Sequence, residues 1–168
     1  MVDHIEIERK FIIKMPDFNS LSSLLGYRMS RITQIYLTSE KGVTHRVRSR
    51  VTDNTAVYTE TKKVRIDAVS SREDEREISE SEFYTLIKNI REGSRPVIKN
   101  RHVFSYKGKI FEIDEYPEWK KTAIMEIELE SREEKIEMPD FLEIVSEVSG
   151  DFRYSNSAMS QSFPSESL

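Results

Sequence analysis

Charged residues recur at every second position in several short segments of this chain, and most of these rows carry a single sign. Side chains of a β-strand alternate between its two faces, so each row lies on one face of its strand. In the first segment Glu6, Glu8 and Lys10 share a face, and mostly apolar residues occupy the other. The other rows are Arg46, Arg48 and Arg50; Glu73, Glu75 and Glu77; Lys99 and Arg101; Glu112 and Asp114; and Glu126, Glu128 and Glu130.

The segments that carry these rows have the length, composition and spacing of strands. Turn-type residues separate most of them, such as Asp53-Asn54 and Lys107-Gly108, and short connections imply antiparallel pairing. The sequence therefore predicts consecutive antiparallel strands over 4–14, 32–38, 44–51, 55–64, 71–78, 97–106, 109–116 and 122–130.

Amphipathic spacing predicts helices over 80–92, 140–149 and 17–25. The first has Ser79 and Glu82 at capping-box spacing and Gly93 as a stop signal. With five glycines and five prolines, the chain has no linker that would divide it. We expect one folded domain over 1–157 and a disordered, serine-rich tail over 158–168.

Composition excludes several classes of protein. The 26 basic and 30 acidic residues give a net charge of −4, which argues against wrapping of nucleic acid by a basic surface. The absence of cysteine excludes disulfides and thiolate metal sites, and three scattered histidines argue against a zinc site. No apolar run approaches the ~20 residues of a membrane span, and the acidic N-terminus is not a signal peptide. We expect a cytoplasmic protein without a membrane or nucleic-acid partner.

The charged rows allow two interpretations. In the first, they are the solvated face of an ordinary antiparallel sheet. In the second, eight strands close into a barrel, the rows point inward, and helices cover apolar outer faces. The sorting of the rows by sign favours the second, because a surface selected for solubility intermixes charges. We therefore predict an α+β fold, an eight-stranded antiparallel β-barrel with a wet, charged lumen and flanking helices. Acidic rows suit a hard divalent cation, and basic rows suit phosphate oxygens.

The order of these motifs resembles the CYTH superfamily, or triphosphate tunnel metalloenzymes, over about residues 4–157. Glu6-Ile7-Glu8-Arg9-Lys10 matches the N-terminal ExExK signature of that family. The later motifs that are similar to the family follow in order: Gln34-Ile35-Tyr36-Leu37, Arg46-Val47-Arg48, Thr61-Lys62-Lys63, Glu73-Asp74-Glu75-Arg76-Glu77, Lys99-Asn100-Arg101, Glu112-Ile113-Asp114-Glu115, Glu126-Ile127-Glu128-Leu129-Glu130 and the closing segment 150–156.

The resemblance implies hydrolysis or cyclisation of triphosphate-bearing substrates with Mg²⁺ or Mn²⁺. Its metal-side carboxylates would be Glu6, Glu8, Glu126 and Glu128. Its phosphate-binding cations would be Lys10, Arg46, Arg48, Lys63, Lys99, Arg101 and Arg153. Glu73, Glu75, Glu112 and Asp114 would orient these cations or position water, and the catalytic set would comprise Glu6, Glu8, Lys10, Glu75 and Asp114. Lys62 and Lys63 point to opposite faces, and the spacing from Thr61 favours Lys63 as the inward lysine.

The leading function is inorganic triphosphatase, with nucleoside triphosphates as further substrates, because the short chain has no second domain to recognise a larger molecule. The alternatives are class IV-type adenylate cyclase, thiamine triphosphatase, RNA 5′-triphosphatase and a non-catalytic polyphosphate-binding module. Trp119 is expected to pack rather than to form the aromatic platform of a thiamine site. The expected partner is a triphosphate or polyphosphate, and the expected assembly is a monomer or homodimer.

Overall fold

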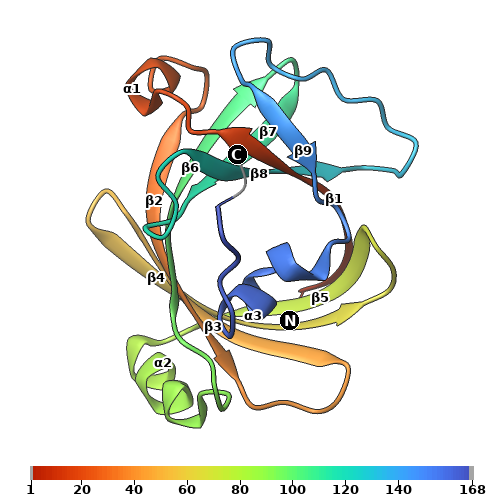
Figure 1. Cartoon of the computed structure of the whole chain (residues 1–168). Helices are drawn as coiled ribbons and strands as arrows, with labels where there is room; N and C mark the ends of the chain where they lie inside the picture. Colours follow the sequence, from red (N-terminus) through yellow and green to blue (C-terminus); the bar gives the residue numbers. More distant parts are fainter. Residues whose placement is uncertain (1, 167–168) are drawn as a thin grey trace.

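The computed structural model describes residues 2–166, with side chains from residue 4 onward, and shows a closed antiparallel β-barrel (Figure 1). Its eight wall strands are β1 (Val2–Lys14), β2 (Arg28–Leu37), β3 (Val43–Thr52), β4 (Thr55–Arg65), β5 (Ser70–Ile78), β6 (Val97–Tyr106), β7 (Lys109–Glu115) and β8 (Thr122–Leu129). Every strand predicted from the sequence is present, and the predicted fold is confirmed.

The strand order around the barrel is β5-β4-β3-β2-β6-β7-β8-β1, and β1 closes the ring by pairing with β5. Ile7 marks the closure, because it is paired with Leu129 of β8 on one edge and with Ser70 of β5 on the other. The β3–β4 hairpin turns on Asp53 and Asn54, both at positive φ, which matches the right-handed twist of the strands it joins.

Apolar side chains lie mainly on the outside of the barrel, where short helices cover them. Helix α1 (Phe18–Leu21) and the segment around Leu142 pack on the outer faces of β1, β6, β7 and β8. Helix α2 (Glu80–Leu86), continued by η1 (Ile87–Asn89), packs Phe83 on β2, β3 and β5. The predicted capping box of Ser79 and Glu82 is present. Within the described residues, no helix is long and apolar enough to span a membrane.

The helix predicted over 140–149 is wrong. The chain there forms β9 (Ile144–Glu147), which pairs with β1 at Phe11–Ile13. The reason is the exposed edge of β1: β5 leaves this edge at Ile7, so the backbone groups beyond it need another partner. The β-branched pair Ile144-Val145 favours a strand. The helix was predicted from the spacing of apolar residues, and that spacing carries no information about the unpaired edge of β1.

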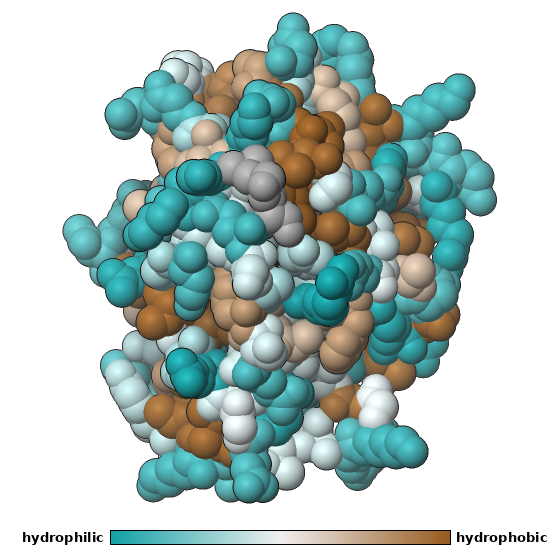
Figure 2. Space-filling view, in the orientation of Figure 1, coloured by the Kyte–Doolittle hydropathy of each residue, from teal (hydrophilic) through white to brown (hydrophobic). Residues whose placement is uncertain are grey.

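A third apolar cluster closes one end of the barrel. Ile12, Tyr36 and Ile124 lie on the inner faces of their strands and meet Tyr154 and Met159 from η2 (Phe152–Tyr154) and α3 (Asn156–Met159). Figure 1 shows α3 and the C-terminal segment inside the ring of strands, and in the space-filling view of this face the centre of the ring is filled (Figure 2).

Residues 158–166, where the sequence predicts a tail, lie against this end of the barrel. The indole of Trp119 donates a 3.0 Å hydrogen bond to the carbonyl of Pro164, and Phe163 packs on the same cluster. The carboxylate of Glu166 accepts from the backbone N–H of Thr122 at 2.7 Å. Residues 167–168 of the predicted tail lie outside the described residues.

Candidate active site

The register of the strands places the charged rows on the inner wall, because residues directly opposite on paired strands share a face. Lys10 lies opposite Glu126, and Arg101 opposite Asp114. The strand order then gathers the rows into two sectors. A basic sector runs over β4, β3, β2 and β6 with Lys63, Arg46, Arg48, Arg50, Lys99 and Arg101. An acidic sector runs over β7, β8, β1 and β5 with Glu112, Asp114, Glu126, Glu128, Glu6, Glu8, Glu73, Glu75 and Glu77, and the cation Lys10 lies among them.

One seam between the sectors is a buried network around Arg101. Its Nε and Nη2 donate to the two oxygens of Asp114 at 2.7 Å each, and Nη2 also donates to Glu126 at 2.8 Å. Lys99 donates to Asp114 at 2.5 Å, and both side chains are 0% exposed. Burial, together with the nearby Arg101, lowers the pKa of Lys99 to about 8. Arg101 and Lys99 outweigh the burial of Asp114 and hold its pKa below the usual range, so it is an ionised clamp rather than a proton carrier.

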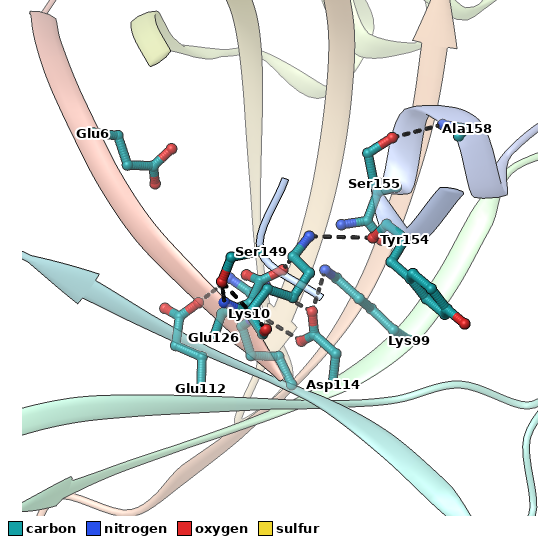
Figure 3. A network of polar contacts seen from close by, with 12 residues as sticks. Glu6, Lys10, Lys99, Glu112, Asp114, Glu126, Ser149, Tyr154, Ser155 and Ala158 are labelled. Atoms are coloured by element: carbon teal, nitrogen blue, oxygen red, sulfur yellow. Dashed lines mark hydrogen bonds and ion pairs between the residues drawn. The ribbon is translucent and has the colours of Figure 1, made fainter. Parts of the chain in front are cut away.

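Lys10 connects this network to the closed end of the barrel. Its Nζ lies 3.1 Å from Glu126 and donates to the backbone carbonyl of Tyr154 at 3.2 Å (Figure 3). Burial opposes the charge of Lys10, but Glu126 and Glu8 outweigh it and raise its pKa. The ammonium group is therefore charged and held between an acidic strand and the C-terminal segment.

The other seam centres on Lys63. Its Nζ lies 2.8 Å from Glu6 and 2.9 Å from Glu73, whereas Lys62 is exposed on the outer face, so Lys63 is the inward lysine of the pair. Burial raises the pKa of Glu6 to about 7 despite Lys63, and Glu8 and Glu73 add to the rise. Thr61 donates to Glu75 at 2.8 Å and fixes that carboxylate on the wall. Negative charge is thus crowded at this seam.

The arginines of β3 stand in the middle of the basic sector. Arg48 makes no ion pair with any described residue, and its Nε donates to the amide oxygen of Gln34 at 3.1 Å. Burial, and then its neighbours Arg46, Arg101 and Arg50, lower the pKa of Arg48 to about 9. The Nε of Arg46 is buried without a hydrogen-bond partner among the described residues. Arg46 lies 3.8 Å from Glu73, so Arg48 is the guanidinium group of this pair that lacks a carboxylate partner, and such a group is suited to bind an anion.

Not every predicted site residue joins this centre. The side chain of Arg153 is 75% exposed and pairs with Asp151 at 2.7 Å, away from the lumen cations. Glu77 and Glu128 are on inner faces but exposed, at the rim of the barrel. The sequence did not predict a role for Gln34. It lies on β2, between the strands that carry Arg48 and Lys99. The Tyr154 carbonyl gave no sequence signal at all, because any residue carries one.

Comparison with solved structures shows the same barrel in other proteins. The inorganic triphosphatase NE1496 matches with a TM-score of 0.60 and 27% identity over 95% of this chain and 96% of that one. PH1819 from Pyrococcus horikoshii matches at 20% identity (TM-score 0.58; 76% of this chain, 80% of that one). HpAC1 from Hippeastrum, described as an adenylyl cyclase candidate with dominant triphosphatase activity, matches at 17% (TM-score 0.50; 76% and 81%). The chain therefore has the fold of the triphosphate tunnel (CYTH) proteins. No protein-family sequence model matches it, and neither does any curated protein sequence.

The acidic sector of this tunnel protein has the donor chemistry for a hard divalent cation. Glu8 and Glu128 lie directly opposite each other and make no ion pair with any described residue. Glu6 and Glu126 are on the same face but are bound to Lys63, Lys10 and Arg101. Within the described residues, no three carboxylates or histidines are already grouped around one point. Carboxylate oxygens are the ligands that Mg²⁺ and Mn²⁺ prefer, so the donor set fits either ion.

Proposed function

We propose that this tunnel protein hydrolyses inorganic triphosphate with Mg²⁺ or Mn²⁺. The observation that carries the proposal is the division of the enclosed lumen into a basic half-wall and an acidic half-wall. A linear triphosphate complexed to a divalent cation is complementary in charge to both sectors: its anionic oxygens face the basic sector and its metal ion faces the acidic sector. The likeness to the inorganic triphosphatase NE1496 supports the same substrate class.

The residues act by binding and orienting rather than by forming covalent intermediates. Arg46, Arg48, Lys63, Lys99 and Arg101 hold the phosphate chain from the basic sector, and Lys10 holds it from the acidic sector. Glu8 and Glu128, together with Glu6 and Glu126, would hold the divalent cation, which would supply charge neutralisation at the phosphate that is attacked. Water adds to the terminal phosphorus as the bond to the bridging oxygen breaks, and the products are orthophosphate and pyrophosphate. Glu75 and Asp114 keep the surrounding cations in place.

A panel of substrates tests the activity. Phosphate release is measured from tripolyphosphate, ATP, thiamine triphosphate and an RNA 5′-triphosphate, each with Mg²⁺, with Mn²⁺ and with a chelator. We expect metal-dependent release that is fastest from tripolyphosphate, because the lumen wall offers charge rather than a stacking surface for a base. Cyclic AMP formed from ATP in place of phosphate would replace the proposal with a cyclase. Binding without any release would replace it with a polyphosphate-binding module.

The assigned role of the carboxylates is tested with Glu8→Gln. The change removes one negative charge from the crowded acidic sector, so we expect metal-dependent turnover to fall at least about 100-fold while the fold is retained. Glu92→Gln is the matched control, because Glu92 is exposed in the loop before β6. Full activity of the Glu8→Gln protein would remove Glu8 from the metal-binding set.

A further inference from the structure

The C-terminal cap, which we define as residues 148–166, closes one end of the barrel with several independent contacts. Tyr154 and Met159 pack against inner-face residues, as described above. The hydroxyl of Tyr116 donates to Asn156 at 2.8 Å, and Lys10 donates to the Tyr154 carbonyl. The cap therefore closes one end of the ring and touches a lumen cation directly.

One side chain outside the barrel wall holds the cap in place. Arg91, in the loop between η1 and β6, directs its guanidinium group at α3 and makes no ion pair with any described residue. Its Nη1 donates to the hydroxyl of Ser157 at 3.0 Å, and its Nη2 donates to the Ser157 carbonyl at 2.8 Å and to the Ser160 hydroxyl at 2.9 Å. Its Nε donates to Ser94 at 2.9 Å, so the fork is fixed from its own loop as well.

The same loop is anchored to the lumen. The backbone N–H of Arg91 donates to the carbonyl of Tyr36 at 2.8 Å, and its guanidinium group lies 5.4 Å from the centre of the Tyr36 ring. Tyr36 lies opposite Arg46 on the inner face of β2. Arg91 therefore joins the cap to β2, a strand of the basic sector. The hydrogen-bond acceptors of its guanidinium group are all neutral, so the group fixes the position of the cap rather than neutralising a charge.

We propose that the cap makes the lumen blind, so that the protein takes polyphosphate only by a chain end, and that Arg91 is the positioning residue that latches the cap. This inference rests on the proposed binding of polyphosphate in the lumen. A closed barrel can hold an internal stretch of a long chain only if the chain threads through both ends. With the cap in place, each end of a polyphosphate chain can enter the lumen of one protein molecule, and the internal phosphates of the chain can bind none.

The latch is tested without substrate through Trp119, the only tryptophan of the chain, which is 3% exposed beneath the cap. Arg91→Ala removes the three hydrogen bonds from Arg91 to Ser157 and Ser160, so we expect local opening to rise about tenfold and acrylamide quenching of Trp119 to increase. Arg91→Lys keeps the charge but not the fork and should be intermediate. Arg95→Ala is the control: Arg95 is exposed, and its contact with Ser160 is made by the backbone N–H. Unchanged quenching in Arg91→Ala would overturn the latch.

The blind end is tested by stoichiometry in a chelator, so that no hydrolysis occurs. Calorimetric titration of long-chain polyphosphate should give one wild-type protein per chain end, whatever the chain length, and more protein per chain with Arg91→Ala. Adding Arg48→Gln to the wild-type protein or to Arg91→Ala should weaken polyphosphate binding, because Arg48 lies in the lumen. Wild-type stoichiometry that grows with chain length, or an Arg91→Ala protein still limited to chain ends although Trp119 is exposed, would overturn the proposal. Absence of any tripolyphosphate binding would instead reject the proposed function, and the Trp119 result would stand apart from it.

Discussion

Arg48 and Arg101 carry the same charge in the same lumen but lie in opposite electrostatic surroundings. Arg101 is bound by Asp114 and Glu126, which raise its pKa despite burial. Arg48 has an amide oxygen as its hydrogen-bond acceptor and other arginines as neighbours, and its pKa is lowered to about 9. The charge of Arg101 is therefore neutralised by carboxylates of the wall, whereas Arg48 has no carboxylate partner among the described residues before the proposed substrate binds.

Neutralising each arginine should accordingly change stability in opposite directions. Arg101→Gln leaves buried carboxylates unpaired, so we expect the free energy of unfolding to fall by about 3–5 kcal/mol. Arg48→Gln removes an unpaired charge, so we expect it to rise by about 1–2 kcal/mol while tripolyphosphate binding weakens at least about tenfold. Urea unfolding and calorimetric binding measure the two effects. Equal destabilisation by both changes would contradict the contrast.

At the scale of elements, His102 determines how α1 is held on the barrel. Its ring stacks on Phe18 with 3.7 Å between centroids, Nδ1 lies 2.9 Å from the hydroxyl of Tyr27, and Nε2 lies 3.1 Å from Glu115. Burial lowers the pKa of His102, and the hydrogen bond to Glu115 opposes this only in part. The neutral ring is the form that suits the packing of α1.

A dependence of stability on pH follows. The pKa of His102 in the folded protein lies below its unfolded value of 6.5, so the unfolded chain binds the proton first as pH falls. The free energy of unfolding should therefore drop as pH is lowered through about 6.5. Urea unfolding between pH 8 and pH 5 measures it, and His102→Gln isolates this histidine from the lumen carboxylates. The His102→Gln protein should be less stable at every pH, but its free energy of unfolding should fall less between pH 8 and pH 5. The same pH dependence in both proteins would show that His102 does not cause it.

Gly150 governs how the cap approaches the β4–β5 turn. It has φ +75°, and a Cβ there would lie 2.9 Å from the Cβ of Ala68. Gly93 has the same φ with open space around it. Both alanine variants should lose about 1–2 kcal/mol through left-handed strain, and Gly150→Ala should lose about 1–3 kcal/mol more through overlap. Thermal unfolding measures the difference, and Ala68→Gly should restore only the Gly150→Ala protein. Equal losses of stability in the two alanine variants would show that the β4–β5 turn moves away from the added methyl group at little cost.

The elements differ in how much of them the sequence determines. The β6 row of Lys99 and Arg101 was predictable because the two cations occupy alternate positions of a strand-like segment and a two-residue turn follows it. The β9 strand was not, since 144–147 forms a strand only because β5 leaves the edge of β1 uncovered. Such a free edge depends on strand stagger, which no local pattern records. Arg153 was assigned to the phosphate-binding cations only through the resemblance of segment 150–156, and it lies in η2 with its side chain 75% exposed and paired with Asp151.

For the whole molecule, the decisive property is the order of strands around the ring. The acidic rows come from β1, β5, β7 and β8 and are scattered along the chain, yet the closure of β1 on β5 makes them one continuous sector. The sequence showed that the rows differ in sign but not which rows would be neighbours. Two opposed half-walls therefore arise from topology, and no single strand contains a binding site.

A consequence is that ligand binding should stabilise the entire barrel rather than one loop, because cations on β1, β3, β4 and β6 must all be in place. In a chelator, tripolyphosphate at about 100 times its dissociation constant should add about 2.7 kcal/mol to the free energy of unfolding, seen as a higher urea midpoint with an unchanged m-value. Orthophosphate at the same concentration should add much less, since it reaches fewer cations. The gain should shrink as salt rises from low ionic strength, because screening weakens the attraction at the open mouth. A changed m-value, or equal stabilisation by orthophosphate, would mean that the anion binds to a local surface patch and not across the lumen.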